Sequence, residues 1–237
     1  MPSVSGFVPA SASVSRTLAE QAAAELYDGI MTGAIAPGSI LRLNEVATSL
    51  GMSLSPVREG LRRLESMGLV AVESHKGARV REVSVEDFED SQKTRALVEV
   101  AAIRLAARNF TAEDAAAARA ALEAHERAVR EGNGVVARRE HTLFHFALYR
   151  AGRSAWLLRA IEPVWENSER YRFSPLSDPA HAESQAEHAA ILAACEAGDE
   201  DAAAAALQAH IDAAAERMRA SLHTRLHAHD AGTPPAD

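Results

Sequence analysis

Residues 43–72, with the sequence LNEVATSLGMSLSPVREGLRRLESMGLVAV, decide the fold of the N-terminal part of the chain. A short helical pattern of apolar residues ends at Gly51, and after a turn a second, Arg-rich helical pattern runs to Gly68. Two helices in this order, with the basic residues on the second one, are typical of a helix-turn-helix motif. The stretch therefore predicts a DNA-binding unit whose second helix lies in the major groove.

The second helix of this motif has two faces. Helical spacing predicts a buried stripe of Val57, Leu61 and Leu64. Another face carries three residues spaced by four positions, Leu54, Arg58 and Arg62. An Arg can pair with guanine or with phosphate, whereas Leu54 cannot donate a hydrogen bond and could contact a thymine methyl group instead. We expect DNA contacts from this face and from the turn before it: Ser53, Leu54, Ser55, Arg58 and Arg62.

The neighbouring segments complete a winged helix. Residues 17–32 form an amphipathic helix pattern, and Asn44 is placed to cap the helix that follows. After Gly68, two apolar runs at 69–72 and 80–83 flank a Gly-containing turn and predict a β-hairpin, the wing. His75 and Lys76 fall at its tip, where they can reach the DNA backbone or the minor groove.

The charge of the chain is distributed unevenly. The net charge is −8, yet residues 42–81 hold seven basic and four acidic residues, so this part is +3 and the remainder −11. A basic module on an acidic body is expected if only one domain contacts phosphate. The single cysteine, Cys195, rules out an internal disulfide framework and fits a reducing cytoplasm. No apolar stretch has membrane-spanning length, and the first residues lack the pattern of a signal peptide.

From Ser84 onward the pattern is helical. Capping-box patterns begin helices at Ser84 and Thr111, and Gly-containing breaks separate the later ones. The expected helices are 86–109, 111–131, 135–151, 154–171, 180–196 and 199–229. Helices with short connections predict an antiparallel bundle. The fold class is thus mainly α, with a winged helix-turn-helix and an all-α bundle of six or seven helices.

Four histidines of this bundle can converge. His141 and His145 are four residues apart on one helix face, and His188 and His210 lie about equally far on either side of the turn at Gly198. If the helices around that turn pair antiparallel, the two local pairs meet and can hold one metal ion. The alternative, that they are ordinary surface or core residues, remains open for a chain with ten histidines. The following we interpret as surface residues: His125, His181, His223, His227 and His229.

Residues 16–83 resemble the winged helix of GntR-type bacterial transcription regulators, above all in SPVREGLRRLESMGLV and the Gly-containing wing. Two positions differ, because Leu54 and Asn44 stand where many relatives have basic residues. Residues 84–222 resemble the helical FCD domain of the FadR-like subgroup, in the segments around Arg95–Glu99, Phe144–His145, Glu187–His188 and His210. The resemblance implies a regulator whose helical domain senses a ligand.

The resemblance also implies site residues. Metal-binding relatives use one Asp and three His, and the three His match His145, His188 and His210. The Asp position is His141 here, which would make the site more cationic. Glu140 is a poorer substitute, because it lies about 140° around the helix from His145, against about 40° for His141. By resemblance Arg95 binds an effector carboxylate; a surface salt bridge with Glu99 is the alternative.

The sequence as a whole predicts a cytoplasmic, homodimeric DNA-binding regulator. We expect partners in double-stranded operator DNA and a small organic-acid or sugar-acid effector, and a divalent metal, zinc before nickel. The expected domains are an arm at 1–15, a winged helix at 16–83, a helical domain at 84–229 and a tail at 230–237. Two other functions remain open: a metal-dependent helical enzyme, and a sensor for which the metal itself is the signal.

Overall fold

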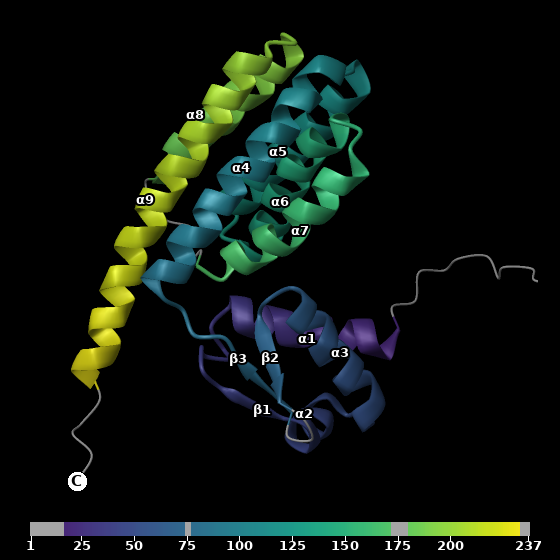
Figure 1. Ribbon diagram of the computed structural model, residues 1–237, viewed down its shortest axis with the longest axis vertical. Coiled ribbons are helices and arrows are strands. Elements are labelled where there is room, and N and C mark those ends of the chain that lie inside the picture. Colours follow the sequence, from purple (N-terminus) through teal and green to yellow (C-terminus); the bar gives the residue numbers. More distant parts are fainter. Residues whose placement is uncertain (1–16, 74–76, 172–179, 233–237) are drawn as a thin grey trace, which may run out of the picture. The chain divides into compact units, whose positions relative to one another are not determined.

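The computed structural model describes residues 17–73, 77–171 and 180–232 (Figure 1). The chain divides into two compact units, Met1–Glu82 and Val83–Asp237. The predicted arm at 1–15, the wing-tip residues His75 and Lys76, and residues 233–237 of the predicted tail lie outside the described residues.

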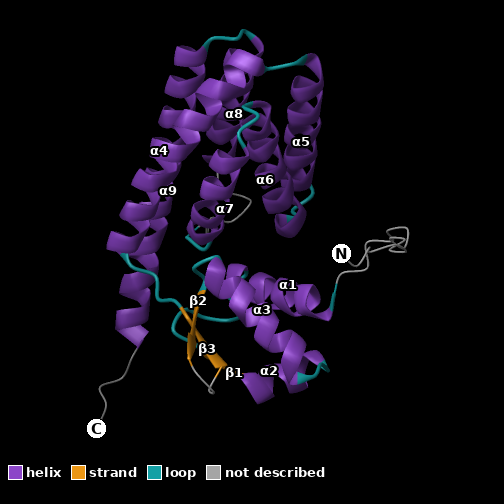
Figure 2. Ribbon diagram, turned by 45° about the vertical axis from the view of Figure 1, so that its right-hand side comes forward, coloured by secondary structure: helices purple, strands orange, loops and turns teal. Residues whose placement is uncertain are grey.

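Within its described residues, the first unit contains three helices and a small sheet (Figure 2). In chain order its elements are α1 (Leu18–Met31), β1 (Ile40–Arg42), α2 (Leu43–Leu50), α3 (Leu54–Ser66), β2 (Val70–Glu73) and β3 (Gly77–Val80). The sheet is antiparallel with the order β1-β3-β2. The predicted winged helix-turn-helix is therefore confirmed, and the predicted stripe of α3 is buried in its core at Val57, Leu61 and Leu64.

The structure adds one strand to this unit and corrects two local expectations. Residues Ile40–Arg42 form a third strand that was not predicted, because three residues are too few for a periodic signal. β3 accepts this strand at Gly77, whose φ is 122° and where a Cβ would lie 2.0 Å from the carbonyl oxygen of Leu41. Asn44 lies inside α2, which has Arg42 as its N-cap. Val83 is not part of the wing but packs beside Phe88 in the second unit.

The second unit is a bundle of long helices. Its described elements are α4 (Val85–Asn109), α5 (Ala112–Arg130), α6 (Gly134–Ala151), α7 (Ala155–Glu169), α8 (Ala180–Glu196) and α9 (Glu200–Gly232). Ser84 caps α4 and Thr111 caps α5 through a full capping box, as predicted. The all-α bundle is confirmed, and its last helix extends three residues beyond the predicted end at 229.

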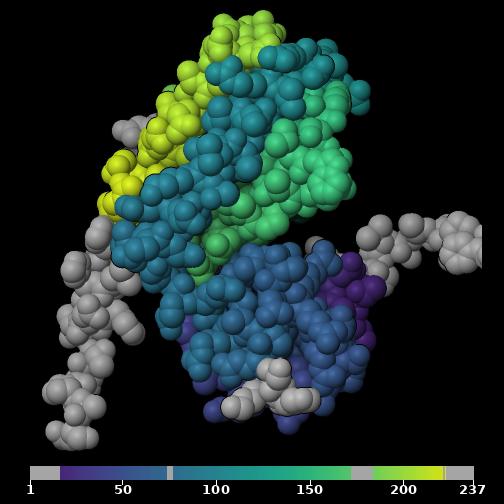
Figure 3. All heavy atoms as spheres, viewed as in Figure 1, coloured from purple at the N-terminus to yellow at the C-terminus, as the bar shows by residue number. Residues whose placement is uncertain are grey.

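Helix pairing in the bundle places the functional side chains inside. α5 packs on α6, α8 on α9, and α4 on both α9 and α7. In the space-filling view of Figure 3, α4 forms a continuous band between α9 and α7. Its inner face joins a core that includes Ile103, Phe144 and Trp165. Among the described helices, none combines the length and the hydropathy that crossing a membrane requires.

Candidate functional site

The first unit carries a groove of about 680 Å³ between α2, α3 and the sheet. It is lined by Arg42, Leu43, Asn44, Glu45, Leu54, Leu61, Arg58, Arg62, Val72, Glu73 and Gly77. Three predicted contact residues, Leu54, Arg58 and Arg62, thus share one concave surface. Ser53 and Ser55 are exposed at the start of α3 but do not line the groove.

Two of the arginines that line this groove form exposed ion pairs with glutamates. Arg62 pairs with Glu59 at 2.9 Å and Arg42 pairs with Glu45 at 3.2 Å, and all four side chains are more than half exposed. Exposed pairs of this kind contribute little free energy, so exchanging the carboxylate for a phosphate costs little. Sequence reasoning missed Arg42, which the unpredicted strand β1 brings to the groove.

The second unit brings all four predicted histidines together. His141 and His145 come from α6, His188 from α8 and His210 from α9, and all four are buried. One ligand nitrogen from each lies within 4.8 Å of the others. The Nε2 atoms of His145 and His188 are 3.3 Å apart, so these two rings point at the same place.

A carboxylate fixes the orientation of His210. Its Nδ1 lies 2.7 Å from Glu187 Oε2, and the guanidinium of Arg217 donates to both oxygens of the same carboxylate, at 2.9 and 3.0 Å. Burial alone would raise the pKa of Glu187, but the hydrogen bonds from His210 and Arg217 outweigh it and hold the pKa at about 2. A carboxylate at Nδ1 leaves Nε2 of His210 with the lone pair that a metal needs.

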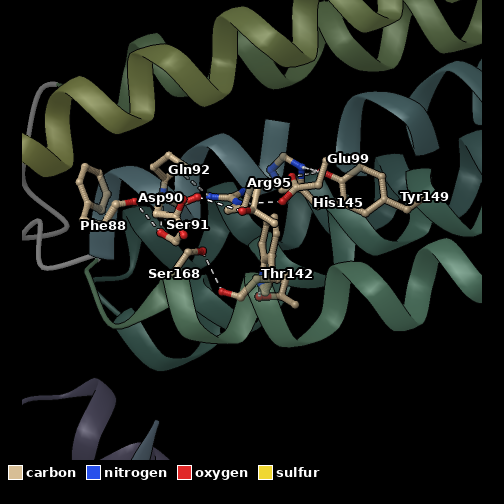
Figure 4. Close-up of polar contacts among 12 residues, drawn as sticks. Phe88, Asp90, Ser91, Gln92, Arg95, Glu99, Thr142, His145, Tyr149 and Ser168 are labelled. Atoms are coloured by element: carbon tan, nitrogen blue, oxygen red, sulfur yellow. Dashed lines mark hydrogen bonds and ion pairs between the residues drawn. The ribbon is translucent and has the colours of Figure 1, made fainter. Parts of the chain in front are cut away.

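Next to the histidines lies a buried ion pair (Figure 4). Arg95 donates to both oxygens of Glu99, at 2.6 and 3.2 Å, and its guanidinium lies over the ring of Trp165. Tyr149 donates to Glu99 at 2.7 Å, and its oxygen is 3.4 Å from Nδ1 of His145. The predicted alternative for Arg95, a salt bridge with Glu99, exists, but it is buried rather than on the surface.

The two partners of Glu99, Arg95 and Tyr149, both keep their protons at neutral pH. Burial would lower the pKa of Arg95, but the carboxylates of Glu99 and, more weakly, Glu169 raise it above the ordinary value. Burial and the charge of Glu99 raise the pKa of Tyr149 well above its usual range. At neutral pH the site therefore contains a charged guanidinium and a protonated phenol.

One expectation about the histidines was wrong. His125 of α5 is buried rather than on the surface, its Nδ1 contacts the carbonyl oxygen of Ala137 at 2.8 Å, and its ring lies 5.4 Å from that of His141. Its sequence position could have shown this, because it follows buried Ala118 and Leu122 by seven and three residues. The other four histidines interpreted as surface residues have side chains outside the described part of the chain.

The donor set of the four-histidine site fits a divalent metal ion. Imidazole nitrogen is a preferred ligand of zinc and nickel, and two of the four rings are oriented through their second nitrogen, as metal-bound histidines usually are. Glu140, the alternative to His141, is not part of the cluster and lies beside Arg139.

Fold and sites together define a winged-helix DNA-binding protein with an attached helical domain that holds a buried histidine cluster. Comparison with known proteins agrees. Residues 18–80 match the bacterial regulatory proteins of the gntR family, and residues 90–213 match the FCD domain. The chain therefore belongs to the GntR family of bacterial transcription regulators, in the group with an FCD domain.

Individual relatives support the same assignment. The "Probable D-xylose utilization operon transcriptional repressor" of Paenarthrobacter nicotinovorans is 34% identical, over 83% of this chain and 87% of its own length. The HTH-type transcriptional regulator McbR of Escherichia coli is 31% identical, over 60% and 64% of the two chains. The solved structure of E. coli McbR/YncC has a TM-score of 0.75 at 25% identity and covers 87% of this chain and 99% of its own. The protein is a DNA-binding transcription regulator, and the enzyme alternative falls away.

Proposed function

We propose that the helical unit controls operator binding through a divalent metal and a small carboxylate effector. The observation that carries this proposal is the convergence of four buried imidazoles from three helices within 4.8 Å. A divalent metal ion would take one ligand nitrogen from each of the four rings. His141, His145, His188 and His210 would hold the ion, with zinc the first candidate and nickel the next.

The chemistry of the site favours an anionic effector. Four neutral imidazoles leave the full charge of a divalent ion uncompensated, whereas an Asp ligand would cancel part of it. The bound ion would act as a Lewis acid toward an oxygen ligand. Arg95 lies beside the histidines through the contacts with Glu99 and Tyr149, and an effector carboxylate that took the place of Glu99 would pair with its positive charge. An organic or sugar acid could thus gain charge compensation at two points.

On the DNA side, the chain would act as a cytoplasmic homodimer on a pseudo-palindromic operator. The contacts would come from the predicted set in the groove and the turn, Ser53, Leu54, Ser55, Arg58 and Arg62, with His75 and Lys76 from the wing. Leu54 stands 42% exposed in the groove, which supports an apolar contact with a thymine methyl group.

The test combines metal analysis with a ligand screen. Protein purified without a His tag should contain one zinc or nickel per chain by elemental analysis. A thermal-shift screen of organic and sugar acids should then yield a ligand whose stabilisation disappears on chelation and which changes affinity for a selected operator. Pentose-derived acids belong in the screen, since one relative is named for D-xylose utilization. Absence of stoichiometric metal, or acids that act equally well with chelator, would refute the proposal.

A second candidate is a direct metal sensor. It is favoured by the number of histidines, because four ligands can complete a tetrahedral shell without an effector. In this case chelation alone changes operator affinity and no acid is needed. Operator binding measured with metal, with chelator, and with acid plus metal separates the two functions.

A further inference from the structure

Glu99 is shared between two partners that belong to different parts of the site. One side of its carboxylate holds the guanidinium of Arg95, and Oε2 also accepts the hydroxyl hydrogen of Tyr149 (Figure 4). Glu99 is completely buried and Arg95 is 2% exposed, so water cannot replace either partner. A change in the position of Arg95 therefore acts on the same carboxylate that binds Tyr149.

The direction of these hydrogen bonds fixes the proton on His145. Tyr149 has one hydroxyl hydrogen, and at 2.7 Å it goes to Glu99. The phenol oxygen can then only accept from the Nδ1 of His145, at 3.4 Å. His145 consequently carries its proton on Nδ1 and its lone pair on Nε2, the nitrogen that faces His188 at 3.3 Å.

We infer that Tyr149 and Glu99 are positioning residues that hold His145 ready for a metal and connect the histidine cluster to Arg95. This inference rests on the proposed metal site and adds its regulation. Carboxylate-backed hydrogen bonds orient a metal-bound histidine and raise its basicity. Here the carboxylate acts through a phenol and is itself neutralised by Arg95. A group that draws Arg95 away from Glu99 strengthens the hydrogen bond to His145, and metal and anion binding reinforce each other.

The first experiment measures zinc affinity by competition with a chelator in the full chain. Tyr149→Phe keeps the ring and removes only the hydroxyl, and we expect a loss of about 10- to 100-fold, the range for such outer partners. Tyr171→Phe is the matched control, because Tyr171 is also buried and donates to a carboxylate, that of Asp87, away from the histidines. If Y149F binds zinc as tightly as the parent protein, or Y171F loses as much, the inference is overturned.

The second measurement reads the tautomer without any metal. Long-range ¹⁵N–¹H spectra of the metal-free protein should show His145 protonated at Nδ1, and Y149F should lose this preference. A merely structural role for the hydroxyl would leave the tautomer unchanged, and an Nε2-protonated His145 in the parent protein would contradict the inference. This result stands even if the parent protein binds no zinc, an outcome that would refute only the proposed metal site.

The connection to Arg95 is tested at Glu99. Glu99→Gln keeps an oxygen that can accept from Tyr149 but removes the charge that pairs with Arg95, and zinc affinity should fall by about 10-fold. Should E99Q not fold, Glu99→Asp keeps the charge and shortens the reach to Tyr149, with the same expected loss. Unchanged zinc affinity in the folded variant would show that His145 does not depend on Glu99.

Discussion

The two units hold their functional side chains in opposite ways. In the winged helix they project from a core that folds without them, and Leu54 is 42% exposed. In the helical unit they are part of the core, and His145 is fully buried. A change in the groove should therefore alter DNA binding and leave stability intact. A change at the histidines should alter ligand binding and folding together.

The largest effect that would test this contrast is expected at the histidine cluster. His145→Ala combined with His210→Ala removes two of four imidazoles. Apparent binding free energies of zinc in four-ligand sites are about 10–16 kcal/mol, so two ligands account for roughly 5–8 kcal/mol, or a loss on the order of 10,000-fold or more. Elemental analysis after dialysis against a mild chelator measures it.

Cys195→Ala is the control for that double variant. Cys195 is buried in the hydrophobic core, where burial raises the pKa of its thiol to about 12, and it is not part of the histidine cluster. The C195A protein should retain its metal. Full retention by the double histidine variant would contradict the buried site.

The same contrast explains what sequence could predict. Helix boundaries followed from apolar periodicity, caps and glycines, and α4, α5, α6 and α8 lie within one residue of the expected ranges. The convergence of His188 and His210 followed from their symmetry about Gly198. These features depend on short-range patterns that are visible in a single sequence.

The missed features depend on contacts between distant elements. β1 exists because β3 lies beside it, and three residues of sequence carry no sign of this partner. The link from Tyr149 to Glu99 joins residues fifty positions apart, and no spacing rule relates them. His125 is the exception, since its place on the buried face of α5 was visible in the pattern.

The next largest effect is expected in the groove. Arg58→Ala should weaken binding to an operator obtained by sequence selection by about 1–3 kcal/mol, roughly 5- to 150-fold, with little change in melting temperature. Arg63→Ala is the matched control, because Arg63 lies on the same helix but pairs with Glu20 of α1 and does not line the groove. Equal losses in the two variants, measured by fluorescence anisotropy at physiological salt, would show a general charge effect instead of a specific contact.

A smaller change refines the role of Leu54. Leu54→Ala removes part of an exposed apolar side chain, and the lost contact should cost about 1 kcal/mol, roughly fivefold in affinity. The loss should be confined to operators with thymine at the contacted position. Selection of binding sequences by the parent protein and by L54A measures the shift in base preference. Identical preferences would remove Leu54 from the reading face.

The smallest effect compares the two units through their helix caps. Thr17 and Thr111 each form a capping box, with Glu20 and Asp114. Replacing either Thr by Ala should cost about 0.5–1 kcal/mol, and the cost should remain local. Hydrogen exchange resolves it: Thr111→Ala should speed exchange in α5 and spare α1, and Thr17→Ala should do the reverse. Each unit has its own cluster of buried residues, so we expect the loss of a cap to act within its own unit. Faster exchange in both units from a single Thr→Ala change would show that they unfold as one cooperative body. In that case a change in the groove would alter stability as well as DNA binding, and the contrast between the exposed groove and the buried histidines would no longer hold.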